Sequence, residues 1–454
     1  TQGYSSAALD VYKRQDDFCV DCTGVSAFFV ISKNNQIKKG CLCKKIAQRR
    51  IKRMENKSQT IVLSLKYVLL AILTGVLVGI IDTVFGRGLL TISDFRTGHY
   101  LYLIPFLPFA GLLITWLYYH FSETSLKGMT LVFETGQKKR EDIPLLLIPL
   151  VMSGTWITHL FGGSAGREGV AVQIGAVLSH VLGRRFHLPK DSRVMLITGM
   201  AAGFGGLFQT PLTAVFFSME VIVAGKIQYE ALLPALIASY TAAYTSHTLG
   251  LEKFYVPLKD TLEISDAGMA VRLIVLGIIF GLTGRLFSFL LAKSKKFFGE
   301  KIKNPYFRIG VISIPLALIL FLLYNGRYSG LGTNLISAAF SGRMIYSYDW
   351  ILKLLLTILT LAIGYQGGEV TPLFSIGASL GIVLGGILSI SPVHCAALGY
   401  AAVFAGATNT LLAPVLIGLE VFGANDMVPF LIVCIFAYLV NGDKSIYGAQ
   451  EVRK

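Results

Sequence analysis

The chain has 454 residues, of which 54% are hydrophobic and 15% are charged, and its mean hydropathy is +0.63. No soluble domain of this length needs so much apolar sequence to fill one core. The composition therefore excludes a soluble domain and predicts a polytopic membrane protein that resides in a lipid bilayer. Nothing in the distribution of the net charge of +15 argues for a nucleic-acid partner.

The first 53 residues differ from the rest of the chain. They carry 11 Lys and Arg against 4 Asp, a net charge of +7, which favours a cytoplasmic N-terminus by the positive-inside rule. They show no signal peptide, membrane span or recognised motif, so we expect residues 1–53 to be a non-native or disordered extension and Met54 to be the natural start. The basic residues 38–53 leave open whether this flank binds anionic lipid headgroups or is simply solvated.

Cysteines in the same segment raise the question of a metal site. Cys19 and Cys22 are two residues apart and could hold zinc, but Cys41 and Cys43 are too tightly spaced for a standard zinc ribbon and no His completes the set. We therefore predict neither a metal nor a cofactor.

Apolar runs of membrane-spanning length, about 20 residues, occupy most of the remaining chain. They lie near residues 60–82, 100–120, 143–161, 194–224, 230–249, 269–292, 307–324, 349–365, 371–390 and 394–440. Several are too short or too long for one simple span, and Gly and Pro interrupt many of them. This pattern, with 47 glycines, predicts an all-α protein of closely packed, broken and tilted helices.

One interruption carries charge inside the apolar sequence. Residues 162–173 read Gly-Gly-Ser-Ala-Gly-Arg-Glu-Gly-Val-Ala-Val-Gln, which places Arg167 and Glu168 where glycines end and a helix begins. A carboxylate in a membrane segment costs roughly 2.5–3.5 kcal/mol on insertion scales, so it persists where it faces a cavity, a partner or an ion path. The unpaired N–H groups at the start of the helix also form an anion site.

An internal repeat organises the chain after residue 60. Residues 201–221 match residues 401–421 at nine of 21 positions, without a gap and at an offset of 200. Each copy has a glutamate in a glycine break upstream, Glu168 and Glu369. Two halves with corresponding broken helices predict a transporter with an ion site near the membrane midplane.

We place the two halves at residues 54–255 and 256–454. The polar residues 251–266 form the boundary, and residues 293–308 are predicted to be a basic loop. Glu220 and Glu420 lie at matching positions of the repeat, which favours a shared structural role over a catalytic one.

These motifs resemble those of the CLC family of anion channels and anion/proton antiporters. The matching features are Gly-Arg-Glu-Gly at residues 166–169, the segment 201–212 with Glu220 beyond it, and Gly-Gly followed by Pro372. They agree in order and spacing over residues 60–450. The resemblance implies two inverted-topology repeats, helix N-termini that converge on a central anion path, and a homodimer.

The departures from the family pattern are informative. Chloride-type members have a serine that faces the central anion, whereas this chain has Met129 after Gly128. The second break contains Glu369 and Thr371, and Val221 stands where antiporters have an inner proton glutamate. Together these changes resemble the CLC-F clade, the bacterial fluoride/proton antiporters, which implies a location in the bacterial inner membrane.

The resemblance also implies roles for individual residues. Glu168 is expected to be the gate and proton carrier, with Glu369 as a second permeation glutamate. The expected anion-binding residues are Gly128, Met129, Gly166, Gly169, Val170, Thr371 and Tyr447, the last closing the path from the cytoplasmic side. An ionised Glu168 would compete with the anion for the same N–H groups and would withdraw when protonated.

Alternative interpretations remain open for several of these residues. Glu168 could form an ion pair with Arg167, Glu369 and Thr371 could cap a helix, and Met129 could fill a core. For the whole chain, a chloride/proton exchanger or a passive anion channel of the same fold is the alternative to fluoride/proton antiport. An enzyme would need a nucleophile with its base or a metal triad, and the sequence shows neither.

Overall fold

The computed structural model describes the backbone of residues 18–20, 26–28, 36–188 and 193–453, and the side chains of residues 62–188 and 193–453. The chain divides into two units, Thr1–Leu65 and Lys66–Lys454. In the first, β1 (Phe18–Val20) pairs with β2 (Ser26–Phe28) in antiparallel register. The four N-terminal cysteine side chains and the basic flank lie outside the described side chains, so those expectations stay predictions.

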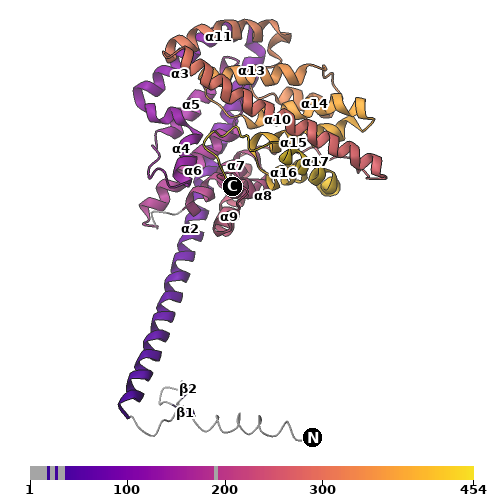
Figure 1. The fold of residues 1–454 in the computed structure, drawn as a ribbon. Helices are drawn as coiled ribbons and strands as arrows, with labels where there is room; N and C mark the ends of the chain where they lie inside the picture. Colours follow the sequence, from indigo (N-terminus) through magenta and orange to yellow (C-terminus); the bar gives the residue numbers. More distant parts are fainter. Residues whose placement is uncertain (1–17, 21–25, 29–35, 189–192, 454) are drawn as a thin grey trace. The chain divides into compact units, whose positions relative to one another are not determined.

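Helices make up almost all of the second unit (Figure 1). The first half contains α2 (Gln36–Leu103), which begins in the other unit, η1 (Ile104–Phe106), α3 (Leu107–Phe121), η2 (Glu123–Lys127), α4 (Met129–Gly136), α5 (Leu147–Leu160), α6 (Glu168–Arg185), α7 (Arg193–Phe208), α8 (Pro211–Glu220), β3 (Val223–Ala224), η3 (Tyr229–Ala231) and α9 (Leu232–Thr248). The second half contains α10 (Ala267–Lys301), α11 (Pro305–Leu322), η4 (Tyr324–Gly326), α12 (Thr333–Ser341), α13 (Asp349–Ile363), α14 (Val370–Leu388), α15 (Pro392–Thr408), α16 (Leu412–Phe422), η5 (Ala424–Asp426), α17 (Met427–Leu439) and β4 (Glu451–Val452).

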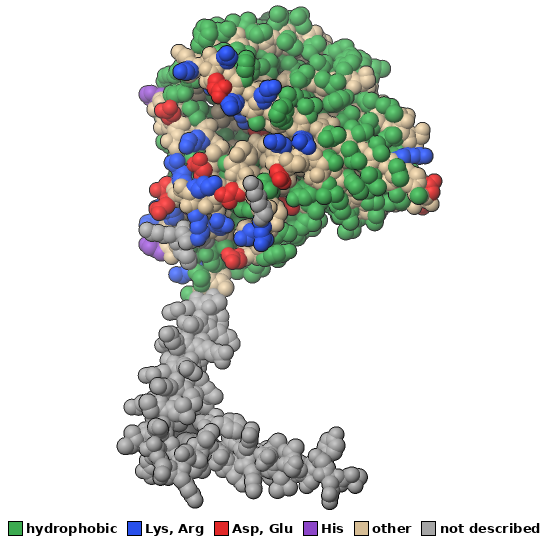
Figure 2. Space-filling view, viewed as in Figure 1, with side chains coloured by type: hydrophobic (Ala, Val, Ile, Leu, Met, Phe, Trp, Pro, Cys, Tyr) green, Lys and Arg blue, Asp and Glu red, His purple; other side chains and the backbone are tan. Residues whose placement is uncertain are grey.

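The helices are apolar but of very unequal length. Among the described residues, four helical segments are long and apolar enough to cross a membrane: Val62–Phe121, Ala267–Lys301, Pro305–Leu322 and Val370–Leu388. Several further apolar helices are only 10–17 residues long. Hydrophobic side chains cover much of the visible surface of the helical unit (Figure 2). The structure thus confirms an all-α fold of broken helices, as expected for a protein solvated by lipid.

The long apolar runs break at equivalent places in the two halves. Gln209 ends the helix α7 and Asn409 ends α15, and both have a positive φ, of 60° and 58°. Their separation of 200 residues equals the offset of the repeat. The same local geometry therefore interrupts both halves just before the short helices α8 and α16.

Glycine contacts repeat in the same way. A Cβ atom on Gly175 of α6 would lie 2.0 Å from the carbonyl oxygen of Gly199 on α7. In the second half, a Cβ on Gly377 of α14 would lie 2.0 Å from the carbonyl oxygen of Gly399 on α15. Nothing larger than a hydrogen atom fits at these glycines. In each half, therefore, the two helices cross with their backbones in direct contact.

Glu220 and Glu420 tie the two halves together. Glu220, at the end of α8, accepts hydrogen bonds from the backbone N–H groups of Leu411, Leu412 and Ala413 at 2.8–3.3 Å, at the start of α16. Glu420 of α16 accepts in turn from the N–H groups at the start of α8 at 2.8–3.0 Å. Each carboxylate thus caps a helix of the other half, where the first backbone N–H groups have no acceptor within their own helix. This confirms the predicted structural role.

The segment between the two halves, residues 251–266, has no regular secondary structure. The predicted loop at residues 293–308 is wrong. Within residues 251–266, Val256 and Leu258 donate to the carbonyls of Val421 and Phe422. Residues 293–308 are not a basic loop, because α10 continues to Lys301 and α11 begins at Pro305. The lysines there are good helix formers, and only Asn304 with Pro305 supplies a helix start. The boundaries 54–255 and 256–454 themselves stay a prediction.

A pair of glycines on α14 offers a test of the backbone contact. We expect Gly377→Ala to lower the melting temperature of the detergent-solubilised protein, because the new methyl group meets the Gly399 carbonyl and overpacking costs about 1–3 kcal/mol. Gly386 is on the same helix, and a Cβ added there would have no neighbouring atom within 4 Å, so Gly386→Ala should leave the melting temperature unchanged or slightly raise it. Equal melting temperatures for the two variants would contradict the packing argument.

Candidate functional site

The N-termini of α6 and α14 meet through their backbones. Gly166 donates to the carbonyl of Gly368 at 2.6 Å, and Gly368 donates to the carbonyl of Gly166 at 2.8 Å. A Cβ on Gly166 would lie 2.8 Å from Cδ of Pro372, and one on Gly367 would lie 2.5 Å from Cβ of Ala165. The glycines of both breaks are therefore required for this contact, which brings two helix N-termini, each favourable to negative charge, side by side.

Glu168 is completely buried at this junction. Its Oε2 accepts hydrogen bonds from the backbone N–H of Thr371, at 3.1 Å, and from the Thr371 hydroxyl. The N–H of Arg167 lies at 3.3 Å from the same oxygen. The other carboxylate oxygen, Oε1, has no hydrogen-bond partner among the described residues, and its distance to Nε of Arg167 is 3.7 Å.

This arrangement defines what Glu168 can do chemically. Its carboxylate takes up a hydroxyl and an N–H donor at the start of α14, which are the groups that a free anion would use there. The contact of the Arg167 side chain, at 3.7 Å, is longer than a hydrogen bond, so the main side-chain partner of Glu168 is Thr371 from the other half of the chain. The Glu168 carboxylate therefore occupies hydrogen-bond donors at the start of α14.

A cavity of about 410 Å³ lies beside this junction. Four of the predicted site residues line it: Gly128, Met129, Glu369 and Tyr447. We call it the Tyr447 cavity. Gly128 has φ of +49° and ends η2 where α4 begins at Met129, so a residue with positive φ is needed at this turn. The other predicted residues, Gly166, Glu168, Gly169, Val170 and Thr371, do not line the cavity.

Tyr447 and Glu369 both line the Tyr447 cavity. Tyr447 is buried and stacks on Phe133 with ring centroids 5.1 Å apart, and its hydroxyl has no hydrogen-bond partner among the described residues. Gly169 lies next to Glu369, since a Cβ there would be 3.8 Å from Oε2 of Glu369.

Sequence reasoning missed several residues of the Tyr447 cavity. Nζ of Lys295, on α10, lies 3.7 Å from Oε1 of Glu369, whose side chain is 15% exposed. Arg308 and Gln173 also line the cavity. The positive charge of residues 293–308 was visible in the sequence, but no motif indicated that it faces Glu369 across the fold.

No group of three His, Cys, Asp or Glu that could hold a metal ion occurs within residues 62–188 and 193–453. The fold and the two glycine breaks instead define an integral membrane protein in which two helix N-termini face each other and one glutamate, Glu168, is buried at their contact.

Comparisons with known proteins assign the chain to a family. Residues 110–442 match the family model described as voltage gated chloride channel. A "Chloride/fluoride channel protein" of Pseudomonas syringae pv. tomato is 34% identical over 394 residues, 85% of this chain and 86% of that protein. The chain belongs to the CLC family.

Solved structures agree with this assignment. One described as a "CLC-type fluoride/proton antiporter" is 51% identical, with a TM-score of 0.84, and the match covers 86% of this chain and 98% of that one. A slow cyanobacterial Cl⁻/H⁺ antiporter has a TM-score of 0.73 at 20% identity over 84% of this chain and 96% of that one, a likeness of fold. The predicted CLC fold with its two inverted-topology repeats is thus confirmed.

Proposed function

We propose that this protein is a fluoride/proton antiporter, a secondary active transporter and not an enzyme, which exports fluoride across the bacterial inner membrane in exchange for protons. The contact between the Glu168 carboxylate and the hydroxyl and N–H of Thr371 carries the proposal. The relatives named for fluoride support the choice of ion. As in the family, a homodimer in the lipid bilayer is the expected assembly.

In this mechanism Glu168 is the gate. While ionised, it holds the donors of Thr371 and excludes the anion from the start of α14. Protonation removes its charge and weakens its hold on these donors, so that fluoride takes its place while the side chain carries the proton away. Because one group either holds the site as a carboxylate or leaves it with a proton, the movements of the two ions are coupled.

The Tyr447 cavity provides the second part of the path. Fluoride holds water tightly, so the path must replace hydration by strong donors. The Tyr447 hydroxyl, which has no hydrogen-bond partner among the described residues, is such a donor, as are the Thr371 hydroxyl and backbone N–H groups. Glu369, beside the cavity and opposite Lys295, is the second group that can take part in proton transfer. Chloride-type relatives have a serine at the position of Met129, so this chain lacks a hydroxyl there.

The first test concerns coupling. We expect Glu168→Gln to abolish proton movement driven by a fluoride gradient in liposomes while the protein stays folded, because an amide keeps the shape of the side chain but cannot titrate. Glu230→Gln, at an exposed glutamate in η3, is the matched control and should pump protons like the wild type. If the Glu168→Gln variant still pumped protons in response to a fluoride gradient, Glu168 would not be the gate and proton carrier.

The second test concerns the choice of ion. We expect the wild type to release fluoride from liposomes far faster than chloride, and Met129→Ser to narrow the difference by raising the chloride rate, since a hydroxyl then faces the path. The measurement is efflux with ion-selective electrodes. If the wild type released both ions equally fast, the protein would be an anion transporter of the same fold without preference for fluoride.

The third test concerns Thr371. Thr371→Val keeps the volume and removes the hydroxyl, so fluoride transport should slow by the value of one charge-assisted hydrogen bond, about 1.5–3 kcal/mol, or roughly 10- to 160-fold. Thr283→Val is the matched control, because within the described part of the chain the Thr283 hydroxyl bonds to the carbonyl of Ile279 in its own helix and to nothing else. An unchanged fluoride rate in Thr371→Val would show that the hydroxyl does not serve the anion.

A further inference from the structure

Helix α13 carries a row of polar side chains into the interior of the protein. We call it the α13 polar row, and its members are Asp349, Lys353, Thr357 and Thr360. Their spacing of three or four residues places them on one face of the helix, and all of them are completely buried. Buried polar groups need hydrogen-bond partners, so the partners of this row show what the helix holds in place.

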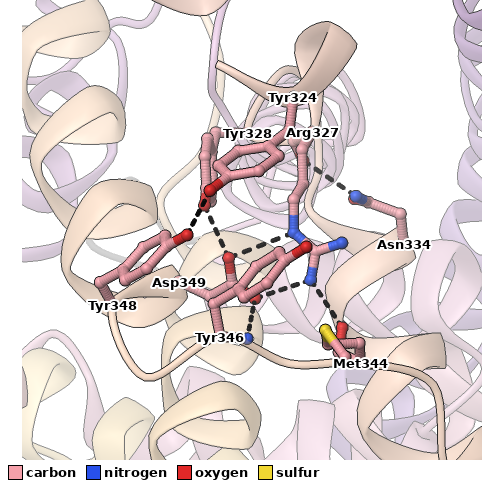
Figure 3. Close-up of polar contacts among 8 residues, drawn as sticks. All are labelled: Tyr324, Arg327, Tyr328, Asn334, Met344, Tyr346, Tyr348 and Asp349. Atoms are coloured by element: carbon pink, nitrogen blue, oxygen red, sulfur yellow. Dashed lines mark hydrogen bonds and ion pairs between the residues drawn. The ribbon is translucent and has the colours of Figure 1, made fainter.

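The first residue of the row fixes the start of α13 (Figure 3). Asp349 accepts hydrogen bonds from Nε and Nη2 of Arg327 at 3.1 and 2.7 Å. It also accepts from the hydroxyl of Tyr328 at 2.6 Å and from the N–H of Tyr346 at 2.9 Å. Four donors fill the capacity of one carboxylate. Asp349 therefore anchors the start of α13 to the segments on either side of α12.

The other three members of the row converge on one residue, Ser164. Its hydroxyl accepts a hydrogen bond from Nζ of Lys353 at 2.9 Å and lies 2.8 Å from the hydroxyl oxygen of Thr357, with which it shares another. Its N–H donates to the hydroxyl oxygen of Thr360 at 3.3 Å. Ser164 belongs to the glycine break of the first half, four residues before Glu168, whereas α13 belongs to the second half. The break is thus tethered to α13 through both its side chain and its backbone.

The same helix supports the partner of Glu168. Helix α13 ends at Ile363, and residues 364–369 join it directly to α14, whose second residue is Thr371. The loop that carries Glu168 and the helix that carries Thr371 are therefore both attached to α13. Their relative position depends on how firmly Ser164 is held.

We infer that the α13 polar row positions the gate: through Ser164 it holds the first glycine break where the Glu168 carboxylate reaches the donors of Thr371. A group that is already held in its bound position loses less conformational freedom when it binds. The tether therefore strengthens the hold of Glu168 on these donors. The inference rests on the proposed function, in which fluoride competes for them, and it follows that the tether sets how much fluoride displaces Glu168.

Thr357 is the positioning residue that a substitution can isolate. Within the described part of the chain its hydroxyl bonds to Ser164 and to nothing else. Thr357→Val keeps the volume and removes this bond, while the Ser164 hydroxyl still accepts from Lys353. The tether is therefore weakened without a change in the residues that contact the anion.

The measurement is the fluoride concentration that half-saturates uptake by proteoliposomes. We expect it to fall in Thr357→Val by roughly 2- to 13-fold, the factor that corresponds to one neutral hydrogen bond, because less fluoride then displaces Glu168. Thr357→Ser keeps the hydroxyl and should have the wild-type value. Thr283→Val, which removes a hydroxyl bonded within α10, is the control and should also match the wild type.

The direction of the change separates a positioning role from a purely structural one. Loss of folded protein lowers the maximal rate and leaves the half-saturating concentration unchanged, and a distorted anion site raises that concentration. Either result in Thr357→Val would overturn the inference, and so would an equal fall in Thr357→Ser. If Thr357→Val does not fold, Thr360→Val, which removes the acceptor of the Ser164 N–H, gives the same comparison.

A second comparison asks whether Thr357 acts through the gate. In Glu168→Ala no carboxylate competes with fluoride, so adding Thr357→Val should leave the half-saturating fluoride concentration of that variant unchanged. A fall of the same size with and without Glu168 would overturn the inference. If the protein transported chloride instead, the same pattern would appear with chloride, so a failure of the tether is distinct from a failure of the proposed function.

Discussion

The structure depends on the direct backbone contact between Gly166 and Gly368. Two helices can place their N-termini against each other only if no side chain intervenes, and each break meets this condition with glycine. The contact brings the unpaired N–H groups of α6 and α14 to one point in a protein otherwise filled with apolar side chains. A carboxylate on one helix is then within reach of a hydroxyl on the other, although 203 residues separate Glu168 from Thr371.

The two halves share a scaffold but not a site. Three features correspond at offsets near 200 residues: the glycine contacts where helices cross, the residues of positive φ that end α7 and α15, and the glutamates that cap α8 and α16. The two glutamates of the glycine breaks, in contrast, have different surroundings. Glu168 is buried and bonded to Thr371, and Glu369 borders a cavity and faces Lys295. Symmetry thus supplies the rigid frame, and local substitutions within it give the two carboxylates different surroundings.

Much of this could be predicted from the sequence, because the deciding features are local. Glycine breaks, an internal repeat and charged residues in apolar runs are visible without a structure. They predicted the fold, and they placed Glu168 at the glycine break where the structure has it. The contacts of Lys295, Arg308 and Lys353 could not be predicted, since each depends on how distant helices pack. The charge of the lysines near residue 295 suggested an exposed loop, but lysine is also a good helix former, and the segment is helical to Lys301.

The exchange of caps by Glu220 and Glu420 has a consequence for biogenesis. When the first half leaves the ribosome, the N–H groups at the start of α8 have no acceptor until Glu420 has been synthesised about 200 residues later. An unsatisfied backbone donor in hydrocarbon costs several kcal/mol. Until the second half is synthesised, the N–H groups at the start of α8 must therefore find other partners, such as water, lipid headgroups or a chaperone. The first half reaches its final structure only when Glu420 accepts these hydrogen bonds.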